Sequence, residues 1–97
     1  MKDIANKVEE NIKKFIAKET IITLEGFIES YINIKKLNYC VESDILEIKD
    51  NMSENYIKIN LNQIYKIEND IEKLKLYLDN DITITLEIKR QTNKSLS

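Results

Sequence analysis

The chain begins with an apolar stripe of helical spacing. Apolar residues recur every three or four positions: Ile4, Val8, Ile12 and Phe15/Ile16. This spacing places them on one face of a helix, which must be buried against the rest of the fold or against a second copy. The sequence therefore predicts a helix over about residues 2–18 that covers the fold or forms a dimer contact.

From Glu19 onward, apolar and polar residues alternate with the period of a half-buried β-strand. Gly26 interrupts the first alternating segment, and a lone glycine in a strand marks a bulge or a close backbone approach. The alternation changes parity at Lys35 and Lys36, as expected of an extra residue at a sharp bend. A turn over residues 42–45 then predicts another hairpin, with Leu46 opposite Val41 and Ile48 opposite Tyr39 on one face.

Residues 62–78 carry two patterns at once. Five apolar residues follow a helical stripe that starts at a possible Asn62 cap: Ile64, Ile67, Ile71, Leu74 and Leu78. The competing interpretation is a strand, a turn at Asn69 and Asp70, and a second strand over 73–78. Asn and Asp in mid-segment are unfavourable in a helix and favourable in a turn.

The segment that follows favours the second interpretation. If residues 79–81 form a three-residue hairpin loop, three apolar pairs fall on one face: Leu78 with Ile82, Leu76 with Ile84, and Leu74 with Leu86. We therefore prefer a hairpin here, and a second helix at 62–78 is the alternative.

Together these patterns predict one α+β domain over residues 1–97. An N-terminal helix at about 2–18 precedes a five- or six-stranded antiparallel meander over about 20–89, and residues 91–97 form a frayed tail. The strands would form a small bent sheet or barrel of the SH3-like or Sm-like kind. The last strand, 82–89, would be an edge that invites pairing, so we expect a homo-oligomer formed through this edge, the helix or both.

Composition limits the class of protein. The 97 residues are 42% apolar and 33% charged, as in a globular chain, and contain no apolar run long enough to span a membrane. Cys40 is the single cysteine, so an internal disulfide is excluded and a cytoplasmic location is expected. Eighteen Ile, fourteen Lys and eleven Asn residues, which A/T-rich codons encode, indicate a low-GC bacterium, or one of its phages or other mobile elements.

Several kinds of chemistry are excluded by residue type. The chain has no histidine, one glycine and one cysteine. This removes histidine-based catalysis, zinc sites built on histidine or several thiolates, and glycine-rich phosphate loops. We therefore expect no enzymatic activity, no cofactor and no metal site. The net charge of −2 makes nucleic-acid binding unfavourable, because such binding requires a basic face.

The candidate site residues are exposed aromatic residues and the scarce clustered cations. Tyr31 lies beside Ile32, and Tyr65 and Tyr77 fall outside the apolar register, so we expect these rings to point away from the core. Outward tyrosines serve protein interfaces and ligand stacking. Lys35, Lys36 and Arg90 are the most plausible contributors to an anion site. These features favour a small anti-defence binding protein that inhibits a host protein, or an oligomeric sponge for a small nucleotide-like signal. The alternatives are an Sm-like or SH3-like nucleic-acid-contacting module and a phage structural or assembly component.

Overall fold

The computed structural model describes residues 3–26 and 28–89. A helix, α1 (Asp3–Ile12), continues into a 3-10 turn, η1 (Lys13–Phe15). A second 3-10 turn, η2 (Leu61–Gln63), lies between two of the eight strands. The strands are β1 (Thr20–Glu25), β2 (Ser30–Ile34), β3 (Leu37–Glu42), β4 (Ile45–Asp50), β5 (Tyr56–Asn60), β6 (Ile64–Asn69), β7 (Lys73–Leu78) and β8 (Thr83–Ile88). The α+β class and the N-terminal helix are confirmed.

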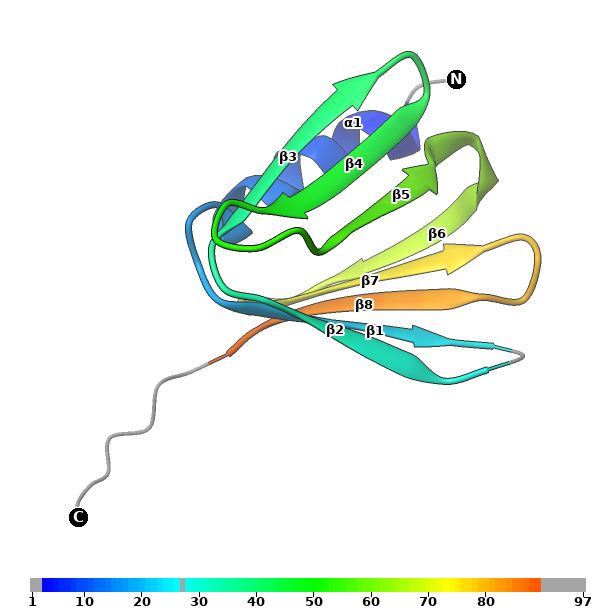
Figure 1. The fold of residues 1–97 in the computed structure, drawn as a ribbon. Helices are drawn as coiled ribbons and strands as arrows, with labels where there is room; N and C mark the ends of the chain where they lie inside the picture. The colour runs from blue at the N-terminus through cyan, green and yellow to red at the C-terminus, as the bar shows by residue number, and fades with distance from the viewer. Residues whose placement is uncertain (1–2, 27, 90–97) are drawn as a thin grey trace.

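All neighbouring strands are antiparallel and form two sheets (Figure 1). The large sheet has the order β2-β1-β8-β7-β6, and the small sheet has the order β3-β4-β5. The chain passes between the sheets at the β2–β3 bend and again through η2. Eight strands exceed the expected five or six, partly because the chain reverses between β1 and β2, where the pattern indicated only a bulge. In the part of the chain that the structure describes, no ladder joins the two sheets into a closed barrel.

The hairpin interpretation of the ambiguous segment is confirmed, and the alternative helix at 62–78 is wrong. In β7 and β8, Leu74 pairs with Leu86 and Leu76 with Ile84. Asp81 has a φ of 67° in the connecting loop, which suits the left-handed position of a three-residue hairpin. Tertiary pairing selected the period of two, because the same apolar residues satisfy both periods over a short segment.

Two other local predictions are confirmed. Val41 pairs with Leu46 and Tyr39 with Ile48 across the β3–β4 hairpin, as expected. Gly26 marks a close backbone approach: a Cβ atom there would lie 3.1 Å from the carbonyl oxygen of Asp81. The glycine therefore allows the end of β1 to lie against the β7–β8 loop.

The expectation that the last strand forms an edge is wrong. Strand β8 lies in the middle of the large sheet, hydrogen-bonded to β7 on one side and β1 on the other. The pairing of β1 with β8 joins segments about 60 residues apart, and no local pattern carries that information. The true edges of the large sheet are β2 and β6.

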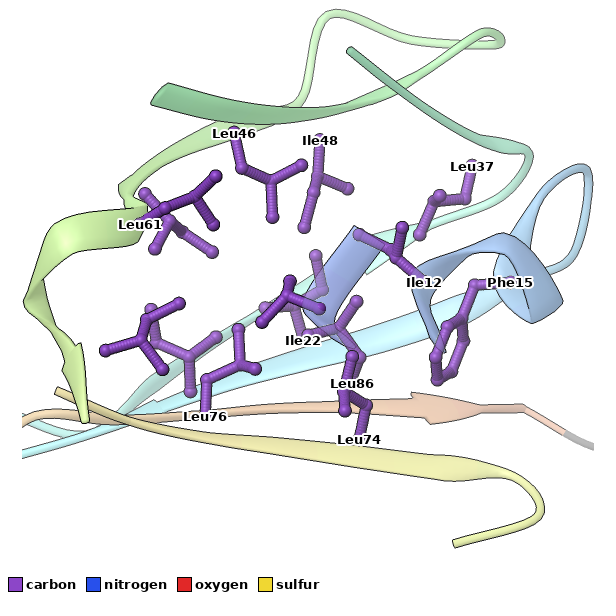
Figure 2. Close-up of a cluster of buried hydrophobic side chains, with 14 of the residues drawn as sticks. Ile12, Phe15, Ile22, Leu37, Leu46, Ile48, Leu61, Leu74, Leu76 and Leu86 are labelled. Carbon is purple, nitrogen blue, oxygen red and sulfur yellow. The ribbon is translucent and has the colours of Figure 1, made fainter. Parts of the chain in front are cut away.

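The helix stripe is buried within one chain. Val8, Ile12 and Phe15 are at most 1% exposed and lie in the core between the sheets. Figure 2 shows Ile12 and Phe15 in the same cluster as residues of both sheets, including Leu37, Leu46, Ile48, Ile22, Leu74, Leu76 and Leu86. Of the two alternatives for the apolar face of the helix, burial against the rest of the fold is therefore confirmed.

The helix is shorter than the expected 2–18. It gives way to η1 after Ile12, and Ile16 is 42% exposed, so the stripe ends at Phe15. Ala17 has a φ of 65°, and its N–H donates to the carbonyl oxygen of Leu37 at 2.8 Å. The chain reverses here because residues 17 and 18 pair with the start of β3 instead of extending the helix.

The end of η1 is also tied to the β6–β7 turn. The Lys14 ammonium donates to Asn69 Oδ1 at 2.6 Å, to the carbonyl oxygen of Asp70, and to the carbonyl oxygen of Lys73 at 3.3 Å. Burial lowers the pKa of Lys14, and the nearby Asp70 carboxylate opposes this shift.

Among the described residues, no helix has the length and apolar character needed to cross a membrane.

Candidate functional site

The outer face of β6 and β7 carries a group of side chains that we name the tyrosine–lysine cluster: Tyr65, Lys66, Glu68, Lys75 and Tyr77. Lys66 pairs with Tyr77 and Glu68 with Lys75 across the two strands, on the face away from the core. The pairing register shifts between Ile64 and Lys66, so Tyr65 is the extra residue of a bulge. Its side chain is 61% exposed, which confirms that it points away from the core.

Side-chain contacts hold the cluster in one arrangement. The Tyr77 hydroxyl donates to Glu68 Oε1 at 2.9 Å, and the Tyr65 and Tyr77 ring centroids are 6.4 Å apart at a tilt of 48°. The ammonium groups of Lys66 and Lys75 lie 5.1 and 5.4 Å from the centroid of the Tyr77 ring, within cation–π range. Lys66 Nζ also lies 3.6 Å from Glu68 Oε2, within ion-pair distance. The Tyr77 ring is thus the centre of the cluster, and Tyr65 is its exposed aromatic member.

The electrostatics of the cluster keep Glu68 ionised. The hydrogen bond from Tyr77 lowers the pKa of Glu68; desolvation opposes the shift, and the charges of Lys66 and Lys75 add to it. A carboxylate with a lowered pKa is a poor general base near neutral pH. The arrangement therefore suits stacking, hydrogen bonding and charge pairing with a partner.

A second candidate is a groove on the outer face of the small sheet, with a volume of about 580 Å³. Its lining combines both charge signs with amide groups, a thiol and one exposed isoleucine: Cys40, Glu42, Ser43, Ile45, Glu47, Lys58, Asn60 and Gln63. Glu47 stands at its centre, paired with Cys40 on one side and Lys58 on the other. The Cys40 thiol lies 3.7 Å from Glu47 Oε1.

The rim of this groove is held in place by backbone and side-chain bonds. The backbone N–H of Leu61 donates to the carbonyl oxygen of Asp44 at 2.8 Å. The side-chain amide of Asn62 donates to Asp44 Oδ2 at 3.0 Å. The β3–β4 turn is therefore attached to η2, and this attachment fixes one end of the groove.

Of the predicted site residues that the structure describes, Tyr65 lies apart from Tyr31, Lys35 and Lys36. Tyr31 is 74% exposed on β2, whereas Tyr65 lies on β6 at the opposite edge of the large sheet. Four inter-strand spacings separate these edges, roughly 19 Å. Lys35 and Lys36 lie in the bend that follows β2, at the same edge as Tyr31. The predicted contribution of Arg90 lies outside the described residues.

The bend reveals a residue that the sequence did not single out. The Asp50 carboxylate, only 5% exposed, accepts hydrogen bonds from the backbone N–H groups of Lys35 and Lys36 at 3.1 and 3.0 Å. It also accepts from the backbone N–H of Met52 at 3.0 Å and the Ser53 hydroxyl at 2.8 Å. Burial alone would raise the pKa of Asp50, but these bonds lower it from 3.8 to about 2. Asp50 and Ser53 have a spacing typical of a turn that is closed by side-chain hydrogen bonds. This spacing is the sequence feature that could have identified Asp50.

Sequence reasoning placed Tyr65 and Tyr77 on the outer face but did not assemble the cluster around them. In the sequence, the polar strand positions Lys66, Glu68 and Lys75 have no feature that distinguishes them from other such positions. The register of β6 and β7 brings these three side chains around the Tyr77 ring. Among the described residues, no group of three or more Cys, Asp and Glu side chains is placed to hold a metal ion. Comparison of the chain with protein-family models, with curated proteins and with solved structures finds no match.

Proposed function

We propose that this chain is a small non-enzymatic binding protein that inhibits another protein by covering its surface with the tyrosine–lysine cluster. The observation that carries the proposal is Tyr65, 61% exposed beside the ordered Tyr77 ring and its two lysines. Tyrosine is enriched at interface hot spots because its ring buries a large area while fixing few torsions.

The order of the cluster supports a protein partner. Tyr77, Lys75 and Glu68 already contact one another, so little side-chain entropy remains to be lost on binding. Lys66 adds a charged donor beside the exposed ring. A partner surface with an apolar recess bordered by carboxylates would complement this arrangement.

The remaining parts of the proposal concern setting and assembly. The Ile, Lys and Asn content supports a phage or other mobile element of a low-GC bacterium, and a host defence protein as the target. The free thiol of Cys40 supports a reducing compartment, the cytoplasm. We also propose that the protein is a homo-oligomer.

Binding to an isolated partner tests the main proposal. Native mass spectrometry of the chain recovered from a host lysate identifies the retained partner, which is then purified. We expect Tyr65→Ala to weaken its binding at least tenfold, the loss typical of a hot-spot tyrosine. Tyr56→Ala is the matched control, because Tyr56 is 57% exposed on the other sheet. Equal affinities of the wild type and the Tyr65 variant would contradict the proposal.

The groove of the small sheet favours a second candidate function, an oligomeric sponge for a small nucleotide-like signal. Its volume of about 580 Å³ lies within the usual range for small-ligand sites. Lys58 would pair with an anionic group, while Asn60 and Gln63 would hydrogen-bond a base. A small ligand retained in native mass spectra and lost in Lys58→Ala, but kept in Tyr65→Ala, would assign function to the groove instead of the cluster.

A further inference from the structure

Strand β2 (Ser30–Ile34) is an edge whose outward backbone groups can be identified. Lys89 N–H donates to the carbonyl oxygen of Glu19 at 2.8 Å. By the alternation of an antiparallel ladder, the odd-numbered residues of β1 then bond to β8 and the even-numbered ones to β2. Tyr31 and Asn33 pair with odd-numbered residues of β1, so they direct their N–H and C=O groups away from the sheet.

A side-chain contact agrees with this assignment. The Asn55 amide donates to the carbonyl oxygen of Asn33 at 3.3 Å, and it approaches from the open side of β2. Asn55 is itself exposed, and the bond is long for an N–H···O contact. Among the described residues, the group that covers the Asn33 carbonyl is therefore a side chain that can rotate away.

Strand β2 also lacks the features that normally protect an edge. Its five residues include no charge and no proline, and its register with β1 is regular. Edge strands usually carry such features because unpaired backbone groups otherwise recruit another strand. Large apolar groups are exposed along it: Tyr31 is 74% exposed, and Ile28, just before the strand, is 70% exposed.

We propose that two copies of this chain pair antiparallel through β2, with a twofold axis at Tyr31, so that their large sheets become one continuous sheet. The two Tyr31 residues exchange two backbone hydrogen bonds across the axis. Asn33 of each copy faces Glu29 of the other, and the backbone N–H of Glu29 replaces the Asn55 amide at the Asn33 carbonyl.

The charges flanking β2 favour a second copy in this orientation. Glu29 precedes the uncharged strand, whereas Lys35 and Lys36 follow it. Antiparallel pairing brings Glu29 of one copy toward Lys35 of the other, while parallel pairing would align like charges. The dimer does not depend on the proposed binding function, since it leaves the tyrosine–lysine cluster exposed at the opposite edge of each large sheet.

Disulfide trapping tests the interface and its register. In a Cys40→Ser background, Tyr31→Cys should form a disulfide-linked dimer on mild oxidation. The two Cα atoms of a hydrogen-bonded pair are about 5.5 Å apart, within the range that a disulfide spans. Asn33→Cys alone is the matched control and should not crosslink, but it should crosslink when mixed with Glu29→Cys. Efficient crosslinking of Asn33→Cys to itself, or none with Tyr31→Cys, would overturn the proposal.

Sedimentation provides a test without cysteines. We expect the wild type to sediment as a dimer at about 100 µM. Tyr31→Pro should be a folded monomer, since the N–H that proline removes faces away from β1. If that variant does not fold, Tyr31→Lys decides, with Tyr56→Lys as the matched variant that remains dimeric. A monomeric wild type, or a dimeric folded Tyr31 variant, would show that β2 does not hold two copies together.

Discussion

The two edges of the large sheet are protected in different ways. Strand β6 carries a bulge and charged side chains, and α1 packs against it. Lys14 holds the turn that follows it. Strand β2 is regular and uncharged along its length, and its only described side-chain cover is the contact from Asn55.

This difference shows which edge of the large sheet is protected from further strand pairing within one subunit. The bulge and charged side chains of β6, together with the packing of α1, hinder the addition of another strand at that edge, whereas β2 leaves two residues with outward backbone groups. At the end of β2, a buried carboxylate fixes the bend to the small sheet but does not cover the edge. Stability and edge protection are thus supplied by different residues, which substitutions can separate.

The largest effect is expected at the β2 end. Asp50→Asn replaces one acceptor oxygen with an NH₂ group that faces backbone donors, so N–H groups that bond to a buried carboxylate lose their partner. We expect a loss of about 3 kcal/mol in the free energy of unfolding, measured by urea denaturation. Glu54→Gln, an exposed residue in the same loop, is the control and should change little. A loss as small as that of the control would mean that the bend does not depend on this carboxylate.

The same carboxylate predicts a pH dependence. Its pKa in the folded chain is about 2, below the ordinary value of 3.8, so the folded state binds this proton less readily. The stabilisation is complete above about pH 5 and is lost as the pH falls through 2. The difference in unfolding free energy between the wild type and Asp50→Asn should therefore narrow between about pH 5 and pH 2. A difference that stays constant over this interval would exclude Asp50 as its source.

A smaller effect is expected on the β6 side. Lys14→Met keeps the apolar stem but removes the donors to Asn69, Asp70 and Lys73. We expect a loss of about 1 kcal/mol, because these acceptors are near enough to the surface to bind water instead. Hydrogen exchange should accelerate at the β6–β7 turn more than at β2. Lys13 is exposed in the same helical turn, so Lys13→Met should change neither the free energy of unfolding nor the hydrogen-exchange rates.

Gly26→Ala tests the approach of the β1 end to the β7–β8 loop. The added methyl would lie 3.1 Å from the carbonyl oxygen of Asp81 and 3.1 Å from Ile82 Cγ1. Loss of unfolded-state entropy offsets part of this crowding, so we expect destabilisation of about 0.5 kcal/mol. Gly26→Val should cost more. A gain in stability for both variants would show that the end of β1 moves away from the β7–β8 loop at little cost.

The smallest effect concerns the order of the tyrosine–lysine cluster. Tyr77→Phe removes the hydroxyl that donates to Glu68 and should raise the pKa of Glu68 toward its ordinary value. NMR titration of the Glu68 carboxyl measures this shift, and the melting temperature should hardly change. An unchanged pKa would mean that the two side chains are not bonded in solution.

Much of the local structure could be predicted from the sequence. The β3–β4 and β7–β8 hairpins follow from alternation and turn residues, and the helix stripe identified Ile12 as part of the core. The edge position of the last strand could not be predicted, because it depends on the pairing of β1 with β8. The candidate site was predicted only as outward tyrosines, since its lysines acquire meaning from the register of β6 and β7.

By itself, the sequence determined much of the apolar core and the turns of the β3–β4 and β7–β8 hairpins, because periodicity and turn propensity act over a few neighbouring residues. Only the tertiary structure decided which strands lie at the edges, since strand order depends on contacts between distant segments. It likewise decided that the Asp50 carboxylate is buried. The backbone N–H groups that bond to it belong to Lys35 and Lys36, in the bend between β2 and β3. Asp50 ends β4 on the same face as the buried Leu46 and Ile48, and two of the hydrogen bonds that satisfy its carboxylate there come from a segment about 15 residues away.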